Sequence, residues 1–425
     1  MTTRKLNDFL TQTGPGTPMG DLMRRYWIPA LMSAELPEPD CPPVRVKLLS
    51  ERLIAFRDSQ GRVGLMDEFC AHRGVSLWFG RNEESGLRCP YHGWKYDVTG
   101  QCIDVPSEPV ESGFCSKIKL KSYPCVELGD VIWAYMGPLE SKPPLPGFEW
   151  ASVSRASRFV SKRTQECNWL QAMEGGIDSA HVSFLHRFDL KSDSLHVSKG
   201  AELTTKTDVA FEVIETPGGM VIGVRRPAHE GHYYWRITQW IMPFHTMIPP
   251  YGDNALNGHA WVPIDDENCW SWCFTHHPTR ALTDHENHVM RNGGGIHVSL
   301  VPGSFRPVIN KDNNYMMDRD AQKANKTYCG VETIAMQDAA IQESMGPVQD
   351  RSKENLTSTD NGVIMARIRL RKAALAAQDG KEPDGLDPAT QAVRSASIVL
   401  PENASFHEAA AEALKVRDGI EHTSV

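Results

Sequence analysis

Two short loops, Cys70-Ala-His72 and Cys89-Pro-Tyr-His92-Gly-Trp94, decide how the rest of the chain is organised. Each loop offers one thiolate and one imidazole. A Rieske-type [2Fe–2S] cluster, with two Cys on one iron and two His on the other, needs this pairing. A zinc site uses the same residue types, but its common spacings place two Cys in one loop and two His in the other. The pattern therefore favours a Rieske cluster held by Cys70, His72, Cys89 and His92 over a zinc site or unliganded side chains.

The composition is typical of a soluble globular enzyme, and the length predicts two domains or one large composite domain. The chain has 425 residues, of which 40% are hydrophobic and 23% are charged. A formal net charge of −8 argues against nucleic acid or an anionic membrane as a partner. No stretch approaches the roughly 20 apolar residues of a membrane span, and the start has no apolar segment typical of a secretory signal. Ten Cys that form no dense framework indicate reduced thiols, so we expect a cytoplasmic protein.

The pattern along the chain indicates where the domains begin and end. Residues 44–67 and 126–135 alternate as β-strands. A stretch with four prolines follows at 137–147 and marks a domain boundary. We expect an N-terminal arm at 1–43, a small antiparallel β domain with the cluster loops at 44–140, a larger domain at 148–360, and a helical tail packed on it at 361–425.

Two segments outside the strands are expected to be helical. Residues 14–30 predict a turn and a short helix that Thr17 caps and Pro29 ends. The tail has an apolar stripe from Val363 to Ala377, which predicts a helix packed on one face. Four basic residues lie mostly off that stripe and are expected to form a solvated face, with docking of a reductase as the alternative. They are Arg367, Arg369, Arg371 and Lys372.

The second stretch that carries chemistry is Asp178-Ser-Ala-His181-Val-Ser-Phe-Leu-His186. Two His and a later carboxylate on one face of an octahedron leave positions open for O₂ and substrate, as non-haem Fe(II) requires. His181 and His186 are about 140° apart on an ideal helix, so both reach one metal only if the helix is distorted or ends between them. The upstream pair Gly175-Gly176 indicates an irregular segment. A His pair alone is more often structural, but a preceding Rieske motif reverses that expectation.

With both motifs, residues 14 to about 360 resemble the terminal oxygenase components of Rieske non-haem iron oxygenases, most closely the phthalate dioxygenase-like branch. The resemblance implies that the two His of the second motif bind iron together with a downstream aspartate, which is followed five positions later by Glu. Asp338 with Glu343 matches this pattern within a segment expected to be helical. Asp350 is the alternative ligand, and physical reasoning alone does not choose between them.

The resemblance also implies an electron path. In the family, the aspartate at the position of Asp178 links a metal His to a cluster His of the neighbouring subunit by accepting a hydrogen bond from each. A trimer or stacked trimers are therefore implied. Because the chain has no flavin or nicotinamide fingerprint of its own, its electrons are expected from a separate NAD(P)H-dependent reductase.

A β-rich region at 211–274 suits a pocket for a planar substrate. Arg225 and Arg226 are adjacent in a strand and must point to opposite faces. A guanidinium that faces the pocket would bind a substrate carboxylate with two hydrogen bonds, although any one such Arg is more often a surface group. The candidates for substrate binding are Arg236, Arg225 or Arg226, Lys206 and, from the resemblance, Asn168.

The expected fold is α+β, with a small antiparallel β Rieske [2Fe–2S] domain and a larger domain whose twisted antiparallel sheet and helices carry a mononuclear iron. The resemblance implies an oxygenase that uses O₂ to cis-dihydroxylate an aromatic carboxylate of the phthalate, isophthalate, chlorobenzoate or phenoxybenzoate type. A monooxygenase that demethylates or hydroxylates an aromatic acid is the alternative, because both activities share these metal motifs. An electron carrier without the second iron and a zinc-binding interaction module are the alternatives from other classes.

Overall fold

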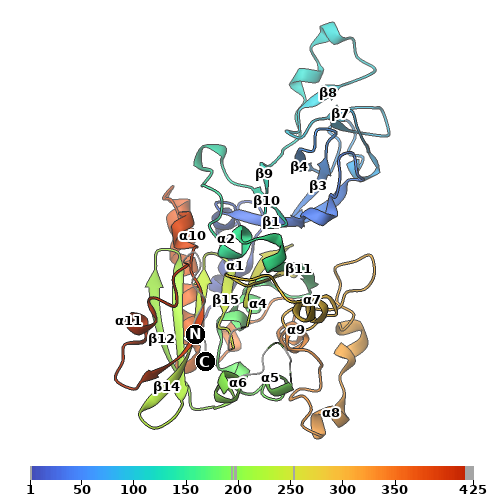
Figure 1. Ribbon diagram of the computed structural model, residues 1–425. Helices are drawn as coiled ribbons and strands as arrows, with labels where there is room; N and C mark the ends of the chain where they lie inside the picture. The colour runs from blue at the N-terminus through green and yellow to red at the C-terminus, as the bar shows by residue number, and fades with distance from the viewer. Residues whose placement is uncertain (1, 193–194, 196–198, 252–253, 417–425) are drawn as a thin grey trace. The chain divides into compact units, whose positions relative to one another are not determined.

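The computed structural model describes residues 2–192, 195, 199–251 and 254–416. The chain divides into two compact units (Figure 1), a smaller one formed by Thr13–Pro143 and a larger one formed by Met1–Gln12 and Pro144–Val425. No helix in the described ranges is both long and apolar enough to cross a membrane.

These units differ from the expected division at the N-terminus. The residues expected to form an arm are shared between the two units. Helix α1 (Arg4–Thr11) packs on helices of the larger unit. Residues 13–43 belong to the smaller unit, because strand β1 (Trp27–Met32) pairs with β10 (Val131–Tyr135).

The smaller unit, all of whose residues are described, contains three small antiparallel sheets. The first joins β1, β10 and β9 (Cys125–Leu128); the second joins β2 (Val44–Leu48), β3 (Glu51–Arg57) and β4 (Val63–Asp67); the third joins β5 (Arg81–Glu83), β6 (Gly86–Arg88), β7 (Lys95–Tyr96) and β8 (Cys102–Asp104). The expected strands are confirmed. The first cluster loop follows β4, the second joins β6 to β7, and Cys70 and Cys89 lie in the hydrophobic core of this unit.

The segment before β1 is only partly as expected. Helix α2 (Pro18–Met23) begins after Thr17, whose side chain accepts a hydrogen bond from the Gly20 N–H, so the predicted cap is confirmed. The prediction that Pro29 ends this helix is wrong, because Pro29 lies inside β1. The strand is at the edge of its sheet and its register shifts between Pro29 and Leu31. An irregular edge position tolerates the missing N–H of proline.

The larger unit is built on an antiparallel sheet of eight strands within the described ranges. Its order is β11-β17-β16-β15-β14-β13-β12, and β18 pairs with the first half of β14. The strands are β11 (Arg158–Gln165), β12 (Ala210–Thr216), β13 (Gly219–Pro227), β14 (His232–Ile241), β15 (His245–Ile248), β16 (Leu256–Pro263), β17 (Cys269–His276) and β18 (Ala396–Pro401).

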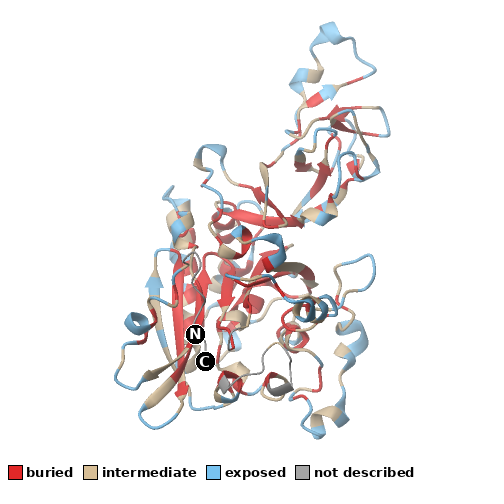
Figure 2. Cartoon of the chain, in the orientation of Figure 1, coloured by how far each residue is buried: buried red, intermediate tan, exposed pale blue. Residues whose placement is uncertain are grey.

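Two helices matter most for the site. Helix α4 (Trp169–Ile177) contacts β14, β15 and β16, and α9 (Ile334–Ser344) contacts α4. The three strands that α4 contacts are buried along most of their length (Figure 2). The other helices are α3 (Glu149–Ser152), α5 (Asp189–Ser192), α6 (Lys199–Thr204), α7 (Asp284–Arg291), α8 (Arg319–Lys323), α10 (Asn361–Gln378) and α11 (Phe406–Ala410).

The C-terminal tail is not wholly helical, which corrects the prediction. Helix α10 is present, but β18 adds a strand beside β14. Arg367 and Arg369, expected on a solvated face, are buried. Arg367 pairs with two carboxylates, and Arg369 donates to carbonyl oxygens of the β12–β13 hairpin, so both hold α10 against the domain. Arg371 and Lys372 are exposed, as expected.

Candidate active site

The two Cys–His loops of the smaller unit share one backbone conformation. In each loop the Cys N–H donates to the carbonyl oxygen five residues later, at 2.9 Å for Cys70 and 2.8 Å for Cys89. The glycine four residues after each Cys donates back to the Cys carbonyl oxygen, at 2.9 and 3.0 Å respectively. These glycines, Gly74 and Gly93, have φ of +72° and +76°, which side chains disfavour. The repeated turn presents one Cys and one His from each loop.

The sulfur and nitrogen ligands differ in exposure. Cys70 and Cys89 are 3% and 2% exposed, whereas His72 and His92 are exposed and their rings lie 4.5 Å apart, centroid to centroid. The Tyr96 hydroxyl lies 3.2 Å from the Cys70 sulfur. Such a donor set suits a [2Fe–2S] cluster with its thiolate side in the core and its imidazole side at the surface, where electrons are exchanged.

The second motif begins where α4 ends. Asp178 is the C-terminal cap of the helix and has an extended backbone, and a 3₁₀ turn follows at His181–Ser183. The helix therefore ends before both His181 and His186 rather than between them, so the 140° separation on one continuous helix does not apply to this pair. The segment between the two histidines is a compact turn, so their imidazole rings lie close together just beyond the end of α4.

The glycine pair in α4 has a different role from the expected one. Gly175 and Gly176 lie inside a regular helix and do not distort it. A Cβ on Gly176 would lie 2.1 Å from the ring of Trp261, and one on Gly175 would lie 2.1 Å from the Gln342 amide. The pair thus lets α4 approach β16 and α9 closely.

Three ligand atoms converge on one point at this place. The Nε2 atoms of His181 and His186 lie 3.3 Å apart. Asp338 Oδ1 lies 3.4 Å from the first and 3.2 Å from the second. Ligand atoms about 2.1 Å from a metal ion are about 3 Å apart at neighbouring positions of an octahedron. Two imidazoles and one carboxylate with open positions are the donor set of non-haem Fe(II).

The alternative ligand lies elsewhere. Asp350 is exposed and caps a 3₁₀ turn by accepting hydrogen bonds from Ser352, and it pairs with Lys353 at 3.0 Å. Glu343 accepts a hydrogen bond from the hydroxyl of Tyr315 at 2.7 Å. Neither belongs to the group of ligand atoms formed with the two histidines.

Gln337, which no sequence motif singles out, orients one of the histidines. Its amide nitrogen donates to Asp189 Oδ2 at 2.9 Å and to the Val331 carbonyl oxygen at 3.0 Å. Its Oε1 therefore faces His186 Nδ1, at 2.7 Å, and accepts the proton carried there. This leaves the lone pair of Nε2 directed at the site, as a metal ligand requires.

Asp178 and Asp338 place negative charge on both sides of His181. Asp178 Oδ2 lies 3.7 Å from His181 Nδ1, and its Oδ1 accepts the Ala180 N–H at 2.8 Å. Burial lowers the pKa of His181, but the two carboxylates raise it more strongly, to about 10. Burial raises the pKa of Asp338, and its histidine neighbours hold it well below its usual range. The site thus favours a cation, which a divalent metal ion would supply.

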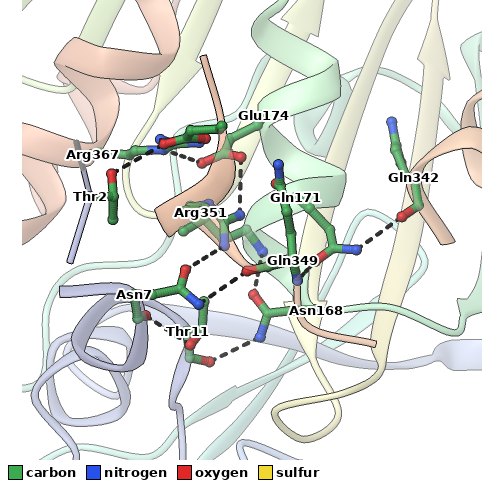
Figure 3. A network of polar contacts seen from close by, with 12 residues as sticks. Thr2, Asn7, Thr11, Asn168, Gln171, Glu174, Gln342, Gln349, Arg351 and Arg367 are labelled. Atoms are coloured by element: carbon green, nitrogen blue, oxygen red, sulfur yellow. Dashed lines mark hydrogen bonds and ion pairs between the residues drawn. The ribbon is translucent and has the colours of Figure 1, made fainter. Parts of the chain in front are cut away.

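A polar network fixes α4, which ends at this site (Figure 3). Gln171 donates to the carbonyl oxygen of Gln342 at 2.9 Å and so joins α4 to α9. Glu174 accepts hydrogen bonds from Arg351 at 3.0 Å and from Arg367 at 2.6 Å, which joins α4 to α10 and to the segment before it.

A cavity of about 100 Å³ lies beside the three ligand atoms. Arg236, one of the predicted substrate residues, lines this cavity and is 3% exposed. Its Nη2 donates to the Pro249 carbonyl oxygen at 3.3 Å, and its guanidinium lies 4.2 Å from the ring centroid of Tyr251. Its Nε and Nη1 have no hydrogen-bond partner in the described part of the chain. Apolar walls come from Val182, Leu190, Ile248, Ala255, Ile296 and Ile334.

The other predicted substrate residues do not line the cavity. Asn168 caps α4 and donates to backbone carbonyl oxygens at 3.0 and 2.7 Å. Lys206 donates to the carbonyl oxygen at the end of β13 at 2.7 Å. Arg225 stacks on a tyrosine ring at 4.2 Å, and it faces away from Arg226, as expected for neighbours in a strand. Arg226 is buried and donates to the Ser179 carbonyl oxygen at 2.6 Å, so it supports the iron-site loop.

Two further residues of the cavity were not anticipated. Arg163 on β11 is 4% exposed, and His259 on β16 is also directed into the cavity. Burial and the charge of Arg163 lower the pKa of His259 to about 3, so its imidazole is neutral. Residues 158–165 carry five polar or charged side chains in succession, which is typical of an exposed strand. Only pairing with distant strands turns this face inward.

Comparisons with known proteins agree with the two units. Residues 26–124 match the family described as Rieske [2Fe-2S] domain, and residues 134–422 match the one described as LigXa C-terminal domain like. The oxygenase subunit of 3-chlorobenzoate-3,4-dioxygenase from Comamonas testosteroni is 37% identical over 96% of this chain and 98% of its own length. The oxygenase subunit of phthalate 4,5-dioxygenase from Pseudomonas putida is 38% identical over 91% of this chain and 89% of its own.

A solved structure has the same fold. The crystal structure of dicamba monooxygenase with non-heme iron and dicamba aligns with a TM-score of 0.55 and 18% identity, over 84% of this chain and 99% of that one. The fold class expected from the sequence is thereby confirmed. Together with the matched families, this shows that the chain belongs to the Rieske non-haem iron oxygenases, as an oxygenase component with a [2Fe–2S] cluster and a mononuclear iron.

Proposed function

We propose that this oxygenase cis-dihydroxylates the ring of an aromatic carboxylate. The observation that carries the proposal is Arg236, a buried guanidinium in the cavity beside the three converging ligand atoms, whose Nε and Nη1 have no hydrogen-bond partner among the described residues. A buried cation with unsatisfied donors and no counter-charge is costly, and a carboxylate matches the fork of donors on Arg. The relatives that act on chlorobenzoate and phthalate support a substrate of this class.

In this proposal each metal group has a defined set of ligands. The cluster is held by Cys70, His72, Cys89 and His92, and the iron by His181, His186 and Asp338. Bound there, the iron supplies the reductive activation of O₂. Gln337 keeps the His186 proton on Nδ1, Arg236 holds the substrate carboxylate, and the apolar walls exclude water from the reacting ring.

The overall reaction balances with one reduced nicotinamide. The product gains both atoms of O₂ and two hydrogens. NAD(P)H supplies two electrons through a separate reductase, and solvent supplies the protons. Asp178 would lie on the electron path, because its side chain is 31% exposed beside His181 and can accept a hydrogen bond from outside the domain. We infer from the family that this donor is a cluster histidine of a neighbouring subunit, so the active unit is a trimer or stacked trimers.

The direct test is turnover with a panel of aromatic carboxylates and methoxybenzoates, with NADH and a phthalate-type reductase. A product with both oxygen atoms and two added hydrogens supports the proposal. Release of formaldehyde from a methoxybenzoate would instead assign the protein to the demethylating monooxygenases. Arg236→Met should raise KM for the best carboxylate about 10- to 100-fold. Arg225→Met, on the opposite face of the neighbouring strand, is the matched control and should leave KM unchanged.

The electron path is tested separately. Asp178→Asn should retain both metal centres and a cluster that dithionite still reduces, yet lose most turnover because the hydrogen-bonded bridge is altered. Unchanged turnover would contradict the role of Asp178. Sedimentation analysis of the holoenzyme tests the trimer, and a monomer that remains fully active would refute it.

A further inference from the structure

The exposed aromatic side chains of the smaller unit gather at its two Cys–His loops. Four Phe, Tyr and Trp residues of this unit are exposed, and all four lie in these loops or directly beside them. They are Phe69, Trp78, Phe79 and Tyr91. Phe69 directly precedes the proposed cluster ligand Cys70. Single exposed apolar residues are normal on a protein surface, whereas a group of them at one place marks an interaction site.

Two arginines cover three of these rings. The guanidinium carbon of Arg45 lies 4.2 Å from the ring centroid of Trp78 and 5.9 Å from that of Phe79. The rings of Trp78 and Phe79 lie 5.0 Å apart. The guanidinium carbon of Arg52 lies 4.5 Å from the ring centroid of Phe69. We call these five residues the arginine–aromatic face. Arg and aromatic residues are the types that dominate the binding energy of protein interfaces.

A buried carboxylate holds both arginines of this face in place. Glu68 Oε1 accepts a hydrogen bond from Arg45 Nε at 3.0 Å, and its Oε2 accepts one from Arg52 Nε at 3.1 Å. The Ser76 hydroxyl also donates to Glu68 Oε1, at 2.6 Å. The arginine side chains nevertheless remain 46% and 58% exposed, so a partner can reach them. Side chains that are already ordered lose less entropy on binding, and the face is therefore preorganised.

The surface around the first Cys–His loop is positively charged, although the chain as a whole has a formal net charge of −8. Arg45 and Arg52 share the carboxylate of Glu68. Arg73 lies within the loop, is exposed, and has its guanidinium 5.5 Å from the ring centroid of Tyr91. Three guanidinium groups thus face solvent beside the carboxylate that two of them share. Charges of opposite sign on a partner would complement them.

We propose that the arginine–aromatic face is the docking surface for the electron donor, which meets it with an acidic surface beside its own redox centre. The inference rests on the proposed function for the existence of a separate reductase. A donor seated on Phe69 lies next to the cluster that Cys70 holds, and one electron passes from the reduced donor to the oxidised cluster. In the proposed trimer a second copy of the chain meets His72 and His92, which are different residues.

The test measures binding and cluster reduction, with the holoenzyme and a phthalate-type reductase but without an aromatic substrate. Trp78→Ala/Phe79→Ala should raise the Kd for the reductase about 10- to 100-fold in titration calorimetry. Arg52→Gln should slow association about threefold to tenfold at low ionic strength and less at high ionic strength. Dithionite, which needs no docking surface, should reduce the cluster of every variant as fast as that of the wild type.

Leu139→Ala/Lys142→Gln is the matched control. It removes one exposed apolar and one exposed basic side chain of the same unit, in the segment after β10 and outside the Cys–His loops. Its affinity for the reductase and its rate of cluster reduction should equal those of the wild type.

An unchanged Kd in Trp78→Ala/Phe79→Ala, or an equal loss of affinity in the control, would overturn the docking surface. An altered sedimentation of that variant with unchanged reductase affinity would assign the face to a second copy of the chain. Loss of affinity only in Arg371→Gln/Lys372→Gln would place the donor on α10 instead.

The proposed reaction and the docking surface fail separately, because no aromatic acid enters the binding test. The expected changes in Kd without product from any acid keep the docking surface and remove the proposed reaction. Product formation with unchanged Kd values keeps the reaction and removes the docking surface. A reductase that supports turnover of no acid and reduces no wild-type cluster would remove both.

Discussion

Glu174→Gln removes one negative charge from the network that holds α4 (Figure 3). Glu174 is 7% exposed and accepts hydrogen bonds from Arg351 and Arg367. Burial raises the pKa of Glu174, but the two arginines lower it further, so the folded protein holds it ionised. Its carbonyl oxygen accepts the Asp178 N–H at 3.1 Å. A change here therefore acts on stability and on the iron site together.

The loss of stability in Glu174→Gln depends on which partners Arg351 and Arg367 keep. Arg367 keeps Glu354 as a partner. Arg351 is completely buried, and its other side-chain contact is the neutral Asn7 oxygen at 3.0 Å. The substitution thus leaves the Arg351 charge uncompensated. Breaking a buried pair in this way costs about 3–5 kcal/mol, which is a large part of the roughly 5–15 kcal/mol that stabilises a typical domain.

Urea unfolding and iron content measure the outcome. Glu174→Gln should lose about 3–5 kcal/mol of unfolding free energy and bind less iron. The double variant Glu174→Gln/Arg351→Met should recover at least about 1 kcal/mol, because it removes the stranded charge. Asp350→Asn, at an exposed pair, is the control and should change neither quantity. A loss below about 1 kcal/mol, or a double variant no more stable than Glu174→Gln, would refute the reasoning.

Three further predictions concern single contacts. Gln337→Leu removes the acceptor of the His186 Nδ1 proton and should weaken iron binding about 10- to 100-fold, measured by metal titration of the apoenzyme. Tyr96→Phe removes the hydroxyl beside the Cys70 sulfur, which stabilises the reduced cluster, and should lower its reduction potential by about 40 mV in a spectroelectrochemical titration. Burial raises the pKa of Glu149, but its arginine and histidine partners lower it to about 2 from 4.5. The ionised Glu149 carboxylate therefore adds about 3 kcal/mol to the free energy of unfolding. This contribution is complete above pH 4.5 and disappears as the pH falls to 2. In urea titrations, the free energy of unfolding of Glu149→Gln should equal that of the wild type at pH 2 and be lower than that of the wild type at pH 7.

Local patterns indicated both segments proposed to bind metal, although the histidine pair gained its meaning only from the Cys–His loops that precede it. The Cys–His loops are contiguous, and the two His near the end of α4 lie within a few residues of one another. Their geometry depends on short-range turns, which the sequence expresses directly. Asp338 came from a resemblance, and the structure places it within 3.4 Å of both imidazoles.

Residues whose direction depends on distant pairing were not predictable. Arg163 sits in a polar strand, and its inward direction follows from β17 and β16, about a hundred residues later in the chain. Gln337 adjoins Asp338 but points to a different side of α9, and its role appears only when His186 is packed against it. Pro29 suggests a helix end from the sequence, because the pairing of β1 with β10 leaves no local signal.

The residues proposed to bind iron and those proposed to bind substrate lie on different secondary-structure elements. The iron ligands and Gln337 come from the segment that follows α4 and from α9, whereas Arg236 and Arg163, which lines the same cavity, come from strands of the sheet. Changes on the strands should therefore alter which acid binds while the iron content stays constant. Changes in the helices should alter the iron content while the preference among acids stays constant. A family that keeps one metal chemistry and varies its substrates can do so with this arrangement, because substitutions in the sheet need not disturb the helices that hold the metal.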